Sequence, residues 1–252
     1  MKFECTEVWG FSHAMRGMRN PKNSWSRGDT VVYNRNDDSN PAELYDLGRP
    51  LTESGDNFVY IGENDMKLAQ TLIRGGSEHR KFMRQIFVSV DITAPFYWWK
   101  EYDTYKVGTV ANSTSTMHKI TSQPIALECF ETDDYHPELT IPTSNYPWEP
   151  DAEVGDYVDD FIGFLEKLRL KYLETNDKRY WKELIRWTPV AWMQKRTLTF
   201  NYENLFAIVH QRMNHKLNEW SGKDFPSNPN FIAWAHTLPY AEELIFLGGD
   251  PE

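Results

Sequence analysis

Cysteine is scarce in this chain of 252 residues, which contains only Cys5 and Cys129. Neither lies in a CxxC pair or at the Cys/His spacing of a zinc site, so we predict no metal site. Two cysteines do not make a disulfide framework, which favours a reducing, cytoplasmic environment. The first residues, MKFECTEVWGF, lack the apolar core of a signal peptide, and no run approaches eighteen apolar residues. We therefore expect neither a secretion signal nor a membrane-spanning segment.

Positive charge is also scarce, because 37 acidic residues outnumber 27 lysines and arginines and give a net charge of -10. Binding to long DNA or RNA requires a basic surface that neutralises phosphates. We therefore exclude a nucleic acid polymer as a general partner. A small anionic ligand needs only a local cluster of cations and is compatible with this composition.

The common catalytic and phosphate-binding motifs are absent. The sequence contains no GxGxxG, GxxxxGK[ST], HExxH or GxSxG segment. It therefore offers no motif evidence for a Rossmann dinucleotide site, a P-loop, a zinc protease or a serine hydrolase.

Aromatic residues, in contrast, are plentiful, at 15% of the chain with ten tryptophans, and hydrophobic residues make up 40%. A chain of this length and composition can bury a large core. No internal repeat and no shift in composition marks a boundary, so we predict one domain over residues 1–252.

Apolar periodicity predicts the elements of that domain. The clearest strand covers 85–93, where Ile86, Val88, Val90 and Ile92 alternate with other residues. The remaining strands are predicted at 2–9, 58–61, 122–131 and 190–200, and the helices at 63–73, from 154 onward, 178–186, 202–220 and 231–247. Irregular connections are predicted at 13–27, 37–55 and 136–150.

The segment 13–27 is unusual because it carries four cations, Arg16, Arg19, Lys22 and Arg27, in an acidic chain. It is either a loop that binds a phosphate or carboxylate, or a solvated loop. We favour the solvated loop, because surface charge usually needs no further explanation.

The segment 94–118 joins an aromatic helix to a run of small hydroxyl and amide residues. Its aromatic residues are Phe96, Trp98, Trp99 and Tyr102, and the polar run begins after Gly108. Aromatic faces beside oriented donors are typical of a pocket for a planar polar ligand. A core helix followed by a solvated loop explains the same pattern equally well.

The segment 202–220 places Arg212 in line with the apolar stripe of its predicted helix. An arginine in that position is costly unless it meets an anion or a carboxylate. The alternative is an arginine that extends from the edge of the stripe into water.

Two parts of the chain resemble the flavin-dependent thymidylate synthases. That family has a Glu-His pair before a strand, a helix opening at a proline, and the signature RHRxxSxNExSxRY. Here Glu78-His79 precedes the strand, Pro95 opens the helix, and Thr104-Tyr105-Lys106 falls where RHR is expected. With one extra residue, 112–118 overlays NExSxRY and keeps Asn112 and Ser115, whereas the signature arginines are absent.

The second similar part is 186–220. The family has an Arg-x-x-Leu-Pro turn, a strand, an asparagine and then an arginine eleven positions later on a helix. Pro189, Asn201 and Arg212 match in type and spacing, and Arg186 lies within a residue of its expected place.

The resemblance implies an α/β (α+β) protein with a mixed β-sheet flanked by long helices. It further implies a homotetramer that methylates dUMP to dTMP, with methylenetetrahydrofolate as carbon donor, FAD as hydride carrier and NADPH as reductant. It assigns the nucleotide to Arg212, Ser115 and Asn112, and the flavin to Lys106, His79 and Asn201. The chain is thus expected to be an enzyme, a methyltransferase with small-molecule nucleotide and folate partners.

The missing arginines support an alternative from another class. Lysine supplies a point charge where the family has bidentate arginines, and this substitution is not conservative. The alternative is a non-catalytic or altered-substrate relative that retains the fold as a nucleotide-binding or structural assembly without flavin.

Overall fold

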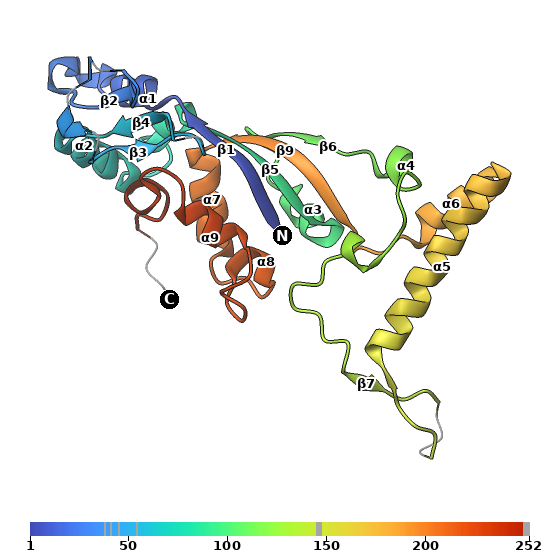
Figure 1. Cartoon of the computed structure of the whole chain (residues 1–252). Helices are drawn as coiled ribbons and strands as arrows, with labels where there is room; N and C mark the ends of the chain where they lie inside the picture. Colours follow the sequence, from blue (N-terminus) through green and yellow to red (C-terminus); the bar gives the residue numbers. More distant parts are fainter. Residues whose placement is uncertain (38, 41, 45, 54, 145–147, 249–252) are drawn as a thin grey trace. The chain divides into compact units, whose positions relative to one another are not determined.

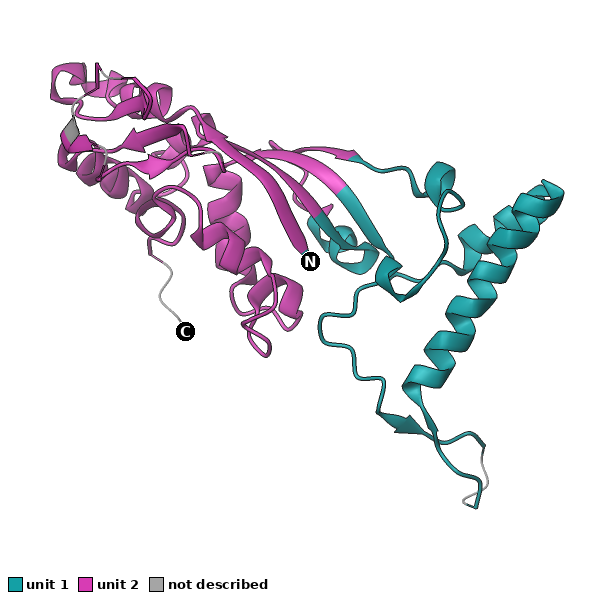
Figure 2. Cartoon of the chain, in the orientation of Figure 1, with its two compact units in different colours: residues 1, 93–102, 113–195 teal, residues 2–92, 103–112, 196–252 magenta. Residues whose placement is uncertain are grey.

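The structure, a computed structural model, describes residues 1–37, 39–40, 42–44, 46–53, 55–144 and 148–248. It separates into two compact units, coloured in Figure 2. Unit 1 comprises residue 1 with 93–102 and 113–195, and unit 2 comprises 2–92, 103–112 and 196–252. Neither unit is one continuous stretch of sequence, and a single domain over 1–252 stays a prediction.

The largest sheet has four strands in the order β1-β5-β9-β6 (Figure 1). Its strands are β1 (Lys2–Trp9), β5 (Phe87–Pro95), β9 (Met193–Asn201) and β6 (Val110–Ser113). In β5, Val88, Val90 and Ile92 are buried and alternate with more exposed residues. The period-two pattern therefore predicted this strand and its buried face correctly.

Unit 2 contains a second, antiparallel sheet of order β2-β4-β3, in which Val31 pairs with Tyr60 and Arg49 with Val59. Its strands are β2 (Val31–Asn34), β3 (Arg49–Pro50) and β4 (Asn57–Tyr60). The helices of this unit are α1 (Phe11–Met18), α2 (Glu63–Arg74), α7 (Tyr202–Arg212), α8 (Asn218–Ser221) and α9 (Phe231–His236), together with a π-helix at Ala241–Ile245.

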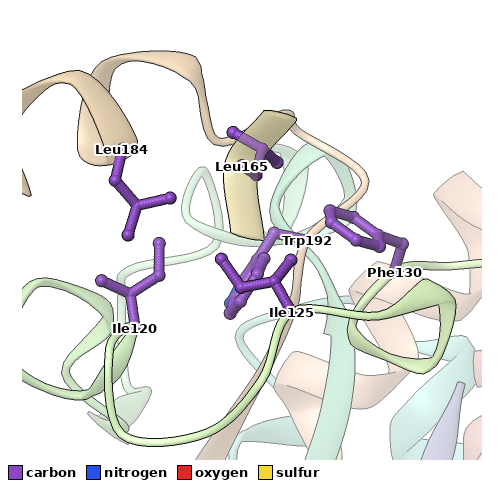
Figure 3. Close-up of a cluster of buried hydrophobic side chains, with 6 residues drawn as sticks. All are labelled: Ile120, Ile125, Phe130, Leu165, Leu184 and Trp192. Carbon is purple, nitrogen blue, oxygen red and sulfur yellow. The ribbon is translucent and has the colours of Figure 1, made fainter. Parts of the chain in front are cut away.

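Unit 1 is built around the helices α5 and α6 and the chain that packs against them. Its elements are α3 (Phe96–Tyr102), α4 (Thr116–Lys119), α5 (Val154–Thr175), α6 (Lys178–Trp187) and the two-residue strands β7 (Thr140–Ile141) and β8 (Ala152–Glu153). Figure 3 shows its core cluster, which consists of Ile120, Ile125, Phe130, Leu165, Leu184 and Trp192.

A partly buried ion pair ties the connection 120–130 to α5. Two nitrogens of Arg169 donate to the two carboxylate oxygens of Glu166, at 2.6 and 2.7 Å, and a third donates to the Thr121 carbonyl at 3.2 Å. Glu166 also accepts the backbone N–H of Ile125 at 2.8 Å. The hydrogen bonds from Arg169 hold the pKa of Glu166 below its ordinary value. Glu166 therefore remains an anion and fixes the loop that carries Ile125 into the core.

The expected fold class, an α+β protein with sheets and flanking helices, is confirmed. The helices predicted from 154 onward and at 178–186 appear as α5 and α6, and those at 63–73 and 231–247 appear as α2 and the α9/π-helix pair. No helix among the described residues is both long and apolar enough to cross a membrane.

Four local predictions were wrong. Residues 122–131 contain a short 3-10 helix (Leu127–Cys129) instead of a strand. Residues 13–18 lie in α1 instead of a loop, and Pro95 ends β5 instead of occupying the first position of α3. The helix predicted over 202–220 ends at Arg212. Parts of the predicted connections 37–55 and 136–150 lie outside the described residues.

Candidate functional site

The segment 103–112 of unit 2 lies against helix α7 and is fastened to its first turn. Asn201 caps this helix: its side chain accepts the Asn204 N–H at 3.0 Å, and the Asn204 side chain accepts the Asn201 N–H at 3.2 Å. Asn204 also donates its side-chain amide to the Val107 carbonyl at 2.8 Å. Gly108 adopts a positive φ of 78°, which favours glycine, directly beside these two asparagines. The reciprocal cap therefore sets where the segment passes the helix.

At the other end of α7, the guanidinium of Arg212 is held by Tyr105. Arg212 Nε donates to the Tyr105 hydroxyl at 2.8 Å, and that hydroxyl in turn donates to Gln211 Oε1 at 3.1 Å. The Arg212 Cζ atom lies 5.5 Å from the Tyr105 ring centroid and 5.0 Å from that of Trp220. Arg212 is thus half-buried between two aromatic rings and a hydroxyl.

Trp220 gives this arrangement a rigid wall. Its side chain is completely buried and packs edge-to-face on Phe231, with ring centroids 5.2 Å apart. Its neighbour Glu219 is also buried, and that burial raises the pKa of the Glu219 carboxyl. The shift weakens the tendency of Glu219 to carry negative charge in this part of unit 2.

A guanidinium between aromatic rings is suited to a planar anionic ligand. The charge and the N–H groups attract phosphate or carboxylate, and the partly exposed Tyr105 ring offers an apolar face to a base, whereas the buried Trp220 ring supports the guanidinium. The sequence pattern had indicated Arg212 as a site residue, but not its neighbours Tyr105, Gln211 and Trp220. Tyr105 stands at the middle position of the expected RHR triplet, which was the one available signal for it.

The first turn of α7 carries a separate charged cluster. Glu203 pairs with Arg84 and, at 3.6 Å, with Arg80, and Arg80 also lies 4.4 Å from the Phe206 ring centroid. The hydrogen bond that Arg84 donates to Glu203 raises the pKa of Arg84. One carboxylate thus already partners both arginines, which limits their capacity to act as cations for a phosphate.

Of the remaining predicted site residues, all but Asn201 are exposed, and they belong to different segments of the two units. Lys106 and Asn112 are exposed on the segment 103–112, and His79 is exposed where it precedes a 3-10 helix (Arg80–Gln85) and packs near Gly75. Asn201 is buried as the cap of α7. Ser115 belongs to unit 1, where its hydroxyl caps α4 by accepting the His118 N–H at 3.4 Å.

Burial decides one of the alternatives that the sequence left open and removes one cation from another. Trp98, Trp99 and Tyr102 are buried in unit 1, and Trp99 donates to the Gln194 carbonyl at 2.9 Å. The aromatic helix is therefore a core helix. In the segment 13–27, Arg19 is buried in an ion pair with Asp65 at 2.5 Å and is not available to a phosphate.

Nothing in the described part of the chain gathers three or more His, Cys, Asp or Glu side chains into a candidate metal site. The polar groups that come together around Arg212 are instead nitrogen donors, a phenol and an amide. This donor set is typical of anion recognition.

The fold is that of the flavin-dependent thymidylate synthases, in a divergent form. The chain aligns with flavin-dependent thymidylate synthase ThyX from Helicobacter pylori, complexed with FAD and dUMP, over 97% of its length and 98% of the other chain. The TM-score is 0.57 and the sequence identity 15%. A second structure of the same enzyme with FAD and dUMP gives a TM-score of 0.59 at 14% identity, over 97% of both chains.

A third solved structure is the UMP/dUMP methylase PolB from Streptomyces cacaoi, bound with 5-Br dUMP. It aligns with 98% of this chain and 95% of its own, with a TM-score of 0.56 and 12% identity. No protein-family model and no curated protein matches the sequence. At these identities the alignments establish a common fold, and the ligands belong to the proteins in which they were found.

Proposed function

We propose that this protein binds a uridine nucleotide at Arg212 and methylates dUMP reductively to dTMP, with methylenetetrahydrofolate as carbon donor, FAD and NADPH. The observation that carries the proposal is the placement of Arg212. Its guanidinium is held between Tyr105 and Trp220 at the position where the resemblance to the synthases expects the nucleotide arginine. The full-length likeness to dUMP-bound structures supports the same assignment.

In this proposal Arg212 binds the nucleotide anion, and Asn112 and Ser115 contribute a side-chain amide and a hydroxyl to the nucleotide. Lys106, His79 and Asn201 are the residues assigned to the flavin. FAD, when bound, would be the hydride carrier between NADPH and the transferred carbon. The cofactor provides the redox chemistry, and the protein orients the cofactor. The residues of this chain bind and orient the reactants.

The described residues fit the nucleotide more completely than the flavin. Lys106 is an exposed point charge, and the Asn201 side chain already caps α7. Arg80 and Arg84 share the carboxylate of Glu203. These features favour, as second candidate, a nucleotide-binding relative that has lost the flavin or changed its substrate. The two candidates differ in one measurable property, namely flavin binding.

The test is the visible absorbance spectrum of the purified protein before and after addition of FAD, followed by titration with dUMP. For the synthase we expect a protein-bound flavin spectrum that dUMP perturbs, because the two ligands would lie in contact. Binding of dUMP without flavin uptake would select the second candidate. If neither ligand binds, the synthase is wrong, and of the second candidate only a relative with a changed substrate remains.

We further propose that the protein is a homo-oligomer in which α5 contacts α5 of a second copy. Tyr157 and Phe164 are 45% and 41% exposed, and they lie seven residues apart on one face of this helix. Asp160 and Lys167 lie on the edge of the same face, on either side of Phe164. In an antiparallel, two-fold pairing centred near Phe164, each Asp160 faces the Lys167 of the other copy.

Replacing Phe164 by aspartate is expected to reduce the molar mass measured by light scattering after size-exclusion chromatography, because the change places four carboxylates at the centre of the pairing. The matched control is Leu173→Asp, which introduces the same charge at an exposed position elsewhere on α5. The control is expected to keep the mass of the unaltered protein. A monomeric unaltered protein would refute this contact, and a tetrameric mass would require a second one.

A further inference from the structure

Tyr105 makes two kinds of contact with Arg212 at once. Its hydroxyl accepts the Arg212 Nε–H at 2.8 Å, and its ring centroid lies 5.5 Å from Cζ of the same guanidinium. Because an arginine Nε–H can only donate, the direction of this hydrogen bond is fixed. Any further hydrogen bond from the guanidinium must come from its two terminal nitrogens.

Gln211 orients the hydroxyl that holds Arg212. A tyrosine hydroxyl has one proton, and this proton is directed to Gln211 Oε1 at 3.1 Å. The hydroxyl oxygen then accepts the Arg212 Nε–H. The order of donation therefore runs from Arg212 through Tyr105 to Gln211, and two of these residues are neighbours at the end of α7.

Trp220 limits the movement of the guanidinium on another side. Its buried ring lies 5.0 Å from Arg212 Cζ, and the Tyr105 and Trp220 ring centroids are 6.4 Å apart. A cation is attracted to the faces of both rings, and an arginine that is already stacked loses less freedom when it meets an anion.

We propose that Tyr105 is a positioning residue that fixes the Arg212 guanidinium against Trp220 for binding of the nucleotide anion. The identity of the ligand in this inference rests on the proposed function. The contact between Tyr105 and Arg212 is a property of the protein without ligand and is tested separately.

The experiment compares Tyr105→Phe with the unaltered protein and with a matched control, Tyr33→Phe. The first change removes the hydroxyl and keeps the ring beside Arg212. The control also removes a donating hydroxyl, because the Tyr33 hydroxyl donates to the Leu44 carbonyl. Tyr33 lies in β2, in the antiparallel sheet of unit 2. Two quantities are measured: hydrogen exchange of the Arg212 Nε–H by ¹⁵N NMR, assigned by its loss in Arg212→Lys, and the dissociation constant for dUMP by calorimetry.

We expect faster exchange of the Nε–H and a roughly tenfold weaker dUMP affinity in Tyr105→Phe, about the effect of one hydrogen bond to a charged group. Both quantities should stay unchanged in Tyr33→Phe. An unchanged Nε–H exchange in Tyr105→Phe would overturn the positioning role. Faster exchange with unchanged dUMP affinity would overturn its importance for the ligand. If the unaltered protein binds no dUMP, the proposed function fails, and with it the ligand part of this inference, while the NMR result still decides whether Tyr105 holds Arg212.

Discussion

Replacing Asp65 by asparagine is expected to lower the free energy of unfolding by about 3–5 kcal/mol, the cost of leaving one member of a buried ion pair without its partner. Asp65 is 1% exposed and Arg19 is 4% exposed. Arg19 Nε donates to Asp65 Oδ1 at 2.5 Å. The change removes the negative charge and leaves the guanidinium buried in unit 2.

The second oxygen of Asp65 adds to this cost. Oδ2 accepts the N–H groups of Asp29 and Thr30, at 3.1 and 3.0 Å, and the Thr30 hydroxyl at 2.6 Å. An asparagine in the same place must direct its NH₂ group either at Arg19 Nε or at the N–H groups of Asp29 and Thr30, and all of these groups are donors. Asp65 therefore joins the first turn of α2 to the start of the chain that leads into β2, and the variant weakens both connections.

The measurement is urea unfolding followed by far-UV circular dichroism, with Asp103→Asn as control. Asp103 is exposed and pairs with Arg196 at 2.8 Å, so the same substitution is expected to cost no more than about 1 kcal/mol there. A double variant, Arg19→Leu with Asp65→Asn, removes the stranded charge and should be less destabilised than the sum of the two single changes. An Asp65→Asn protein as stable as the Asp103→Asn control would show that the pair contributes little.

The Arg19–Asp65 pair also shows what the sequence could not reveal. The 46 positions that separate these residues carry no pattern that links them, and Arg19 was grouped with surface cations because it stands among Arg16, Lys22 and Arg27. Helix α1 was, in contrast, detectable, since Phe11, Ala14, Met15 and Met18 recur at helical spacing and are all buried. The neighbouring glycine and charged residues outweighed that signal.

Two other errors have a common cause, namely hydrogen bonds from side chains to the backbone. The alternating apolar residues of the segment around Ile125 predict a strand. The Ile125 N–H, however, donates to Glu166, and the Ile125 side chain enters the core of unit 1 from a loop. The helix predicted through 220 ends at Arg212, because His215 accepts the Leu217 N–H and the Ser221 hydroxyl donates to the His215 carbonyl. Such local bonds compete with regular structure and have little periodicity.

The long periodic elements were predictable because each one buries an apolar face. This applies to β5, α2 and α5, whose patterns of apolar residues extend over at least nine positions. For the candidate site, the sequence indicated Arg212 by its chemistry and by the resemblance, whereas Trp220 reaches it only because the helix breaks. The partners of Arg212 thus depend on an irregular turn that periodicity does not describe.

Replacing Arg212 by alanine is expected to weaken dUMP binding about 100-fold, equivalent to about 2.8 kcal/mol. The variant loses the guanidinium that the proposal assigns to the nucleotide anion. Stability should fall by much less, about 1 kcal/mol, because Arg212 is half-buried and Trp220 keeps its packing on Phe231.

Arg212→Lys separates charge from geometry. Lysine retains the positive charge but cannot reproduce the contacts of a planar guanidinium with the Tyr105 and Trp220 rings together with the Nε–H hydrogen bond, so we expect an intermediate loss of about tenfold. Arg74→Ala is the control, because Arg74 is likewise the last residue of a helix in unit 2 and is exposed. Calorimetry with dUMP and thermal unfolding are measured for all three variants. Equal dUMP affinity in Arg212→Ala and Arg74→Ala would remove Arg212 from the nucleotide site, whereas an equal loss in the alanine and lysine variants would show that the held geometry, more than the charge, determines binding.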